Sequence, residues 1–273
     1  TGFLGGIVYE GGEGMKQWGV LFKKEMIGHF RDRKWIWVPL VLIILAVMDP
    51  VTNYYMPQIL DAVGGLPEGA VFEMPEISEV DATKMSISQL SSLGVLIIAL
   101  ISMGTIATER KSGIAELILV KPVAYSAYIL SKWAALLVLV LVSYLLSMLF
   151  AWYYIGVLYG FIPVKDFLLL TSFYGLWLML VVTVSIFYNT LFRSSGLVAF
   201  STIATLLLMS GISSLFGERL KFSPNQLSAH AFSFLHTGEI PNALYGSAVV
   251  TIVICVLLLL ASVYIFHTKE HAG

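Results

Sequence analysis

Long uncharged stretches constrain this chain more than any other feature of its sequence. Five of them run from Met85 to Thr108, Trp133 to Val164, Phe167 to Phe192, Ser194 to Gly217 and Ile240 to Thr268. A helix needs about 20 apolar residues to cross about 30 Å of hydrocarbon, and each stretch is long enough. A sixth, Trp35 to Met48, is short before Asp49-Pro50. Val51 to Met56 can complete it, and its alternative is a re-entrant or interfacial segment.

The composition agrees with a membrane protein. Of the 273 residues, 58% are hydrophobic and 12% are charged, whereas a soluble domain carries about 25% charged residues. The predicted fold class is an all-α integral membrane protein with six transmembrane helices and an N-terminal amphipathic interfacial helix. The spans are expected over about 35–56, 88–108, 133–158, 167–190, 196–215 and 245–267, within a transmembrane domain of residues 35–273. Residues 1–14 precede the first methionine and are interpreted as a leader or a cloning remnant.

Residues 15–34 have the pattern of an amphipathic helix. Aromatic and aliphatic side chains recur there at helical spacing, at Trp18, Leu21, Phe22, Met26 and Phe30. Cations on such a helix can reach lipid phosphates, and the candidates are Lys23, Lys24, Arg31 and Arg33. The alternative is a simple extension of the first span into the cytoplasm.

The distribution of Lys and Arg predicts the orientation. Six spans place twelve of the sixteen cations on one side, whereas the other side holds Lys84, Lys165, Arg219 and Lys221. Lys and Arg gather on the cytoplasmic side of membrane proteins. The sequence therefore predicts a multi-pass protein of the cell membrane with both termini in the cytoplasm.

Catalytic motifs are absent from the sequence. There is no G-x-x-x-x-G-K-[ST] loop for ATP phosphates and no H-E-x-x-H metal site. His267 and His271 are four residues apart, and an interfacial polar anchor is their commoner role. Apart from Asp49, no ionisable side chain lies in the middle of a predicted span, which argues against proton-driven transport. No catalytic residue, metal site or nucleic-acid partner is predicted.

The loop between the second and third spans carries the most informative pattern. Ser112 is a plausible N-cap, and Ile114, Leu117 and Ile118 fall on one helical face at i, i+3, i+4 spacing. Lys121 precedes Pro122 and disfavours further helix. The pattern predicts a helix of about two turns with an apolar stripe just below the membrane. The stripe either docks on a partner or packs on the protein's own inner surface or on lipid.

A family resemblance rests on this loop and on the layout of the chain. An acidic and basic cluster is followed by Gly, a Leu-Ile-Leu run, Pro, a Tyr- and Ser-containing stretch and a Lys that opens the next span. In this layout the chain resembles the permease subunits of bacterial ABC exporters of the second type, which share their topology with the G subfamily of eukaryotic ABC transporters. The matching residues are Glu109, Arg110, Lys111, Gly113, Glu116, Leu117, Leu119, Pro122, Tyr125, Ile129 and Lys132.

The resemblance implies a function and partners. The loop would be a coupling helix that inserts into a groove of a separate ATPase subunit, and two membrane subunits would assemble with two ATPase subunits. The second membrane subunit would be another copy or a paralogue. ATP and Mg would be bound by the ATPase, with no cofactor in this chain. The coupling residues expected are Glu109, Arg110, Lys111, Gly113, Ile114, Glu116, Leu117, Ile118 and Pro122.

The fifth span would lie near the dimer axis and contribute hydroxyls to the translocation route. The candidates are Ser201, Thr205, Ser210 and Ser213. The leading hypothesis is therefore the transmembrane subunit of an ATP-driven exporter. The alternative is a non-ABC carrier or channel that uses only its own spans. A membrane enzyme or signalling subunit is a third hypothesis, for which no convergent reactive residues can be named.

Overall fold

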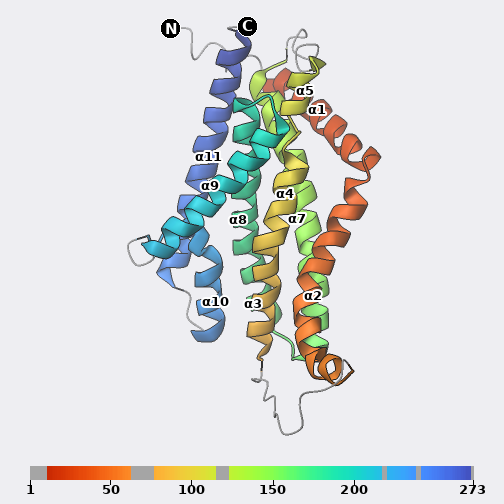
Figure 1. The fold of residues 1–273 in the computed structure, drawn as a ribbon. Coiled ribbons are helices and arrows are strands. Elements are labelled where there is room, and N and C mark those ends of the chain that lie inside the picture. Colours follow the sequence, from red (N-terminus) through yellow and green to blue (C-terminus); the bar gives the residue numbers. More distant parts are fainter. Residues whose placement is uncertain (1–10, 63–76, 115–122, 217–219, 238–240, 272–273) are drawn as a thin grey trace.

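The computed structural model describes residues 11–62, 77–114, 123–216, 220–237 and 241–271, and within these ranges its regular structure is helical (Figure 1). Six of the helical stretches are long and apolar enough to cross a membrane. The prediction of an all-α membrane protein with a helix before the spans is confirmed. The first of these stretches, Lys34–Leu60, continues through Asp49 and Pro50 as a single helix.

The helices extend beyond the uncharged stretches, because a helical backbone can continue past a charged side chain once it has left the hydrocarbon.

The second span is divided into four pieces, whereas the other spans are single helices. In chain order the elements are α1 Gly11–Arg31, α2 Lys34–Ala62, α3 Glu79–Gln89, the π-helix η1 Leu90–Gly94, α4 Val95–Ser102, α5 Ala107–Lys111, α7 Tyr125–Leu158, α8 Val164–Leu191, α9 Ser195–Leu215, the 3-10 helix η2 Pro224–Gln226, α10 Leu227–Thr237 and α11 Asn242–His271.

Helices α7 and α8 form the centre of the bundle. Helix α2 packs on α7, and α11 packs on α8 (Figure 1). Buried aromatic side chains fill the contact between the two central helices, where the rings of Tyr144 and Tyr174 lie 5.3 Å apart. Helices α9 and α11 lie at the edge and expose many large apolar side chains. Such surfaces suit lipid or another apolar partner.

Helix α1 lies obliquely across one end of the bundle, close to α5, and we call this the α1 end (Figure 1). It separates from α2 at Arg33, whose φ of 57° is the left-handed conformation of a helix C-terminus. One face, which includes Leu21 and the buried His29, packs inward. Phe30 is instead exposed. The inward face therefore differs from the predicted apolar stripe, which included Phe30.

Candidate functional site

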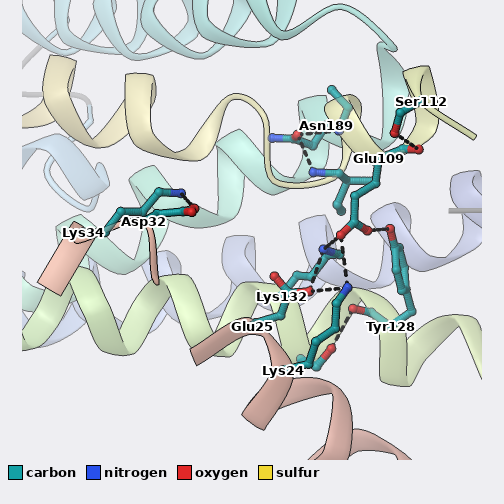
Figure 2. A network of polar contacts seen from close by, with 12 residues as sticks. Lys24, Glu25, Asp32, Lys34, Glu109, Ser112, Tyr128, Lys132 and Asn189 are labelled. Carbon is teal, nitrogen blue, oxygen red and sulfur yellow. Dashed lines mark hydrogen bonds and ion pairs between the residues drawn. The ribbon is translucent and has the colours of Figure 1, made fainter. Parts of the chain in front are cut away.

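Four charged side chains and one tyrosine meet at the α1 end and form what we call the charge cluster (Figure 2). They are Lys24 and Glu25 of α1, Glu109 of α5, and Tyr128 and Lys132 of α7. Lys132 Nζ lies 2.8 Å from Glu25 Oε1 and 3.0 Å from Glu109 Oε1. Lys24 Nζ lies 3.2 Å from Glu109 Oε1, and the Tyr128 hydroxyl donates to Glu109 Oε2 at 2.6 Å. The cluster joins three helices that are remote in sequence.

The charges of the cluster compensate one another, since it holds two cations and two carboxylates. The Lys132 side chain is only 2% exposed, and a buried ammonium needs such partners to offset its lost hydration. The Lys24 side chain is 48% exposed. Burial lowers the pKa of Lys24, but the carboxylates of Glu109 and Glu25 outweigh this and hold the pKa above its usual value. Lys24, which was predicted to be able to reach lipid phosphates, therefore faces the cluster as a cation.

His29 lies one turn beyond Glu25 on α1 and is buried. Within the described part of the chain, its Nε2 atom has no hydrogen-bond partner. Burial, followed by the nearby charge of Lys34, lowers the pKa of His29 to about 4. The ring is therefore neutral at pH 7 and adds no charge beside the cluster.

Asn189 of α8 holds the break between α4 and α5. Its Oδ1 atom accepts hydrogen bonds from the backbone N–H groups of Ile106 and Ala107, each at 3.0 Å. Its Nδ2 atom donates to the carbonyl oxygens of Ser102 and Ser185 at 3.0 and 2.9 Å. Helix ends leave such backbone groups without intrahelical partners. The amide thus uses its donors and acceptor to fix the position of α5.

Arg110 attaches α5 to two further helices. Its Nη1 atom donates to the Thr190 carbonyl at 2.8 Å, and its guanidinium lies 5.4 Å from the centre of the Phe266 ring. Arg110 is only 6% exposed. The sequence predicts that Glu109 and Arg110 orient the loop in a partner groove, whereas their side chains bind within the chain. Their effect on a partner would therefore act through the position of α5.

The predicted coupling loop begins directly after α5. Ser112 is the C-cap of α5, and its hydroxyl donates to the Glu109 carbonyl at 3.2 Å. The prediction that Ser112 is an N-cap was wrong, because its hydroxyl closes the preceding helix. Gly113 has a φ of 75°, the left-handed conformation that glycine adopts most readily, and the chain is helical again at Ile114.

The structure places the coupling residues in three groups. Glu109 and Arg110 are engaged internally, whereas Lys111 and Ile114 are exposed beside the turn at Gly113. The remaining predicted coupling residues lie outside the described residues. These residues are Glu116, Leu117, Ile118 and Pro122. Docking of this loop on a partner stays a prediction.

The four hydroxyls predicted to line a route on α9 are not brought to one site. Thr205 pairs with the Tyr188 hydroxyl at 2.7 Å, and Ser213 pairs with the Ser223 hydroxyl at 2.8 Å. Ser201 is half-buried. Ser210 is exposed and lines a pocket of about 610 Å³ between the second span and α9. Of the four candidates, Ser210 is the one that contributes to this pocket.

Sequence reasoning missed Asn189 and the roles of Glu25 and Lys132 in this site. An isolated amide at the end of an apolar span was the available signal for Asn189, because polar side chains in spans bind neighbouring helices. The charge cluster had no local signal, since Lys132 and Glu25 are 107 residues apart. In the described part of the chain, no three His, Cys, Asp or Glu side chains converge in a way that could hold a metal ion.

Comparison with known proteins gives two matches. Residues 20–270 match the model of a family described as ABC-2 family transporter protein. The chain is also similar to the uncharacterized transmembrane protein YxlG of Bacillus subtilis (strain 168). The two are 32% identical over 259 residues, which cover 94% of this chain and 99% of the relative.

Proposed function

Because this chain belongs to the ABC-2 transporter family, it is a membrane component of an ABC transporter, and we propose that it provides an export pathway driven by a separate ATPase subunit. Permeases of this family work with ABC ATPase subunits and are themselves non-catalytic. Family membership argues against the two alternatives, a non-ABC carrier or channel and a membrane enzyme.

The observation that carries the coupling proposal is the anchoring of α5. This short helix is held by Asn189 at its start, by Arg110 on one side and by Glu109 in the charge cluster. Three attachments to the bundle on a five-residue helix make α5 a firm base for the segment that follows it. A displacement of that segment by a partner would therefore pass to α1, α7 and α8 through the same contacts.

The remaining parts of the proposal follow from the family and from the charge distribution. Two membrane subunits, either copies or paralogues, assemble with two ATPase subunits, which bind ATP and Mg. The exposed apolar face of α9, which includes Leu207 and Leu208, faces the second membrane subunit or lipid. The α1 end lies on the cytoplasmic side of the cell membrane, so that both termini are cytoplasmic.

Substitution of the apolar stripe tests this function. Leu117→Asp replaces an apolar contact by a charge that would be buried unpaired in a partner groove. Burial of a leucine contributes about 1.5–3 kcal/mol, so the variant is expected to lose most of the bound ATPase when the tagged chain is purified from membranes. Ser126→Asp adds the same charge at an exposed position outside the stripe, in the first turn of α7, and is the matched control. Normal ATPase copurification and transport by Leu117→Asp would exclude this loop as the coupling element.

A further inference from the structure

A pocket of about 610 Å³ opens between the second span and the α9–α10 region, in the half of the bundle away from the α1 end. One wall is formed by α3, η1 and α4. The opposite wall is formed by α9, η2 and α10, with Trp177 of α8 at the back. Figure 1 shows α10 beside α3 and α9 crossing beside α4. None of these residues is used by the charge cluster.

The π-helix η1 shapes this pocket. Three consecutive residues, Ser91, Ser92 and Leu93, line it, and all three belong to η1. The Ser91 hydroxyl lies 3.0 Å from the Tyr174 hydroxyl of α8, which fixes η1 against the central helix. Single π turns within α-helices occur frequently at functional sites.

The lining changes from charged to polar to apolar along the second span. Lys84 lies nearest the start of α3, Ile87 and the serines of α3 and η1 follow, and the apolar residues Leu93, Val95 and Leu96 come last. Leu96 follows Lys84 by 12 positions, which corresponds to about 18 Å along a helix. On α9 the order is similar, because Ser210 lies nearest the end of the helix and the apolar residues Leu207, Leu206 and Ile203 lie farther from it. This order matches the polarity of an amphiphile with its head group at the rim.

The charge of the pocket selects the sign of that head group. Among the described lining residues Lys84 is the only charged side chain, and it has no ion pair or hydrogen bond with another described residue. Hydroxyls of Ser88, Ser210 and Ser228 add hydrogen-bonding groups to the same pocket. Lipid tails are as apolar as leucine, so the alkyl part of a ligand gains little over the bilayer. Recognition must therefore come from the polar end of the pocket.

We propose that this pocket binds an amphiphile with an anionic head group, which Lys84 contacts at the rim while the alkyl part lies along Leu96 and Ile203. The inference rests on the proposed function in one respect, because it identifies the substrate class of the transporter. The same chemistry is presented by an anionic lipid of the membrane and by an anionic amphiphile that is exported.

Head-group preference of the full-length chain tests the proposal. The purified chain in a neutral detergent is titrated with dodecyl phosphate and with dodecylphosphocholine, which share an alkyl chain, and bound ligand is counted by native mass spectrometry. The phosphate is expected to bind about tenfold more tightly, a factor that corresponds to about 1.4 kcal/mol. Lys84→Gln is expected to reduce this preference to about twofold or less. Lys165→Gln removes an exposed cation outside the pocket and should keep the preference.

Two results would overturn the proposal. One is equal affinity of the unsubstituted chain for the two ligands. The other is a preference that survives in Lys84→Gln. Ser210→Leu provides a second variant that narrows the pocket without changing its charge, and it should weaken binding of both ligands to the same extent.

A second measurement distinguishes an exported amphiphile from a resident lipid of the membrane. When the complex with its ATPase is reconstituted in phosphatidylcholine vesicles, an exported amphiphile is expected to raise ATP hydrolysis, whereas a resident lipid binds without doing so. Both results uphold the head-group chemistry. Loss of the preference together with normal ATPase copurification overturns this inference alone, and absent copurification with an intact preference overturns the coupling function alone.

Discussion

The charge cluster can be tested by a double-mutant cycle with Lys132→Met and Glu109→Gln. At an effective dielectric constant of about 20, two unit charges about 3 Å apart attract by about 5.5 kcal/mol before the cost of desolvation. The distance from Lys132 Nζ to Glu109 Oε1 is 3.0 Å. Removing one partner of a fully buried pair costs about 3–5 kcal/mol, because the other charge stays buried. The Glu109 side chain is 19% exposed, so the expected loss in free energy of unfolding is about 2–3 kcal/mol for each single variant.

The double variant is expected to cost little more than one single variant. Both changes together leave Lys24 and Glu25, which lie 3.3 Å apart and still compensate each other. The coupling energy between Lys132 and Glu109 should therefore be about 2 kcal/mol, above the error expected for independent sites.

The measurement is the free energy of unfolding of the full chain in mixed micelles during titration with a denaturing detergent, followed by tryptophan fluorescence. Lys34→Met is the control, because Lys34 pairs with the more exposed Asp32 at 3.9 Å. An exposed pair contributes about 0–1 kcal/mol. Additive effects of Lys132→Met and Glu109→Gln, to within about 0.5 kcal/mol, would refute the reasoning.

Four further outcomes are expected. Asn189→Leu should destabilise the chain by about 3 kcal/mol and speed hydrogen exchange at the Ile106 and Ala107 amides, because loss of the Asn189 acceptor leaves these buried donors unpaired. Asn53→Leu is the control. Unchanged exchange in Asn189→Leu would contradict the role of Asn189. The pKa of His29 is about 4 in the folded chain and about 6.5 in the unfolded chain. Between pH 6.5 and pH 4 only the unfolded chain protonates this ring, so the stability of the folded chain falls as the pH falls through this window. Thermal unfolding of His29→Gln should depend less on pH between 7 and 5, and equal dependence would count against a buried neutral His29. The purified chain alone should hydrolyse no ATP above a mock preparation. An impermeant thiol reagent added to intact cells should label a cysteine at position 68 and miss one at 116, and the reverse pattern would invert the topology.

Much of the fold could be predicted from the sequence because the bilayer imposes a length on every apolar stretch. The six spanning helices follow from that rule, and the helix before them follows from the helical spacing of its apolar side chains. Helix ends could not be placed by charge alone. Lys132 is a charged residue outside the uncharged stretches, yet it lies two turns inside α7 and is buried. Its burial depends on Glu25 and Glu109, which only the tertiary structure brings together.

The sequence drew attention to the loop after the second span, but it did not reveal the contacts that hold the start of this loop. The stretch from Glu109 to Pro122 stood out by composition, and the structure describes its first part, in which a turn at Gly113 is followed by the exposed apolar side chain of Ile114. Docking of this stretch on a partner stays a prediction. The inward direction of Glu109 and Arg110 was not predictable, because both have partners 19 or more residues away. A pattern of charges at the membrane edge looks the same whether it faces a partner or the protein's own helices.

The π-helix in the second span also sets a rotational register. A π turn closes its hydrogen bonds one residue later than an α turn, so η1 accommodates one residue more than a regular helix would. One residue corresponds to about 100° around an α-helix. If the same residues formed a regular α-helix, α3 with Lys84 would be turned by about this angle relative to α4, and Lys84 and Leu96 would no longer face the same side. The π turn thus keeps the pocket-facing sides of α3 and α4 aligned along the second span.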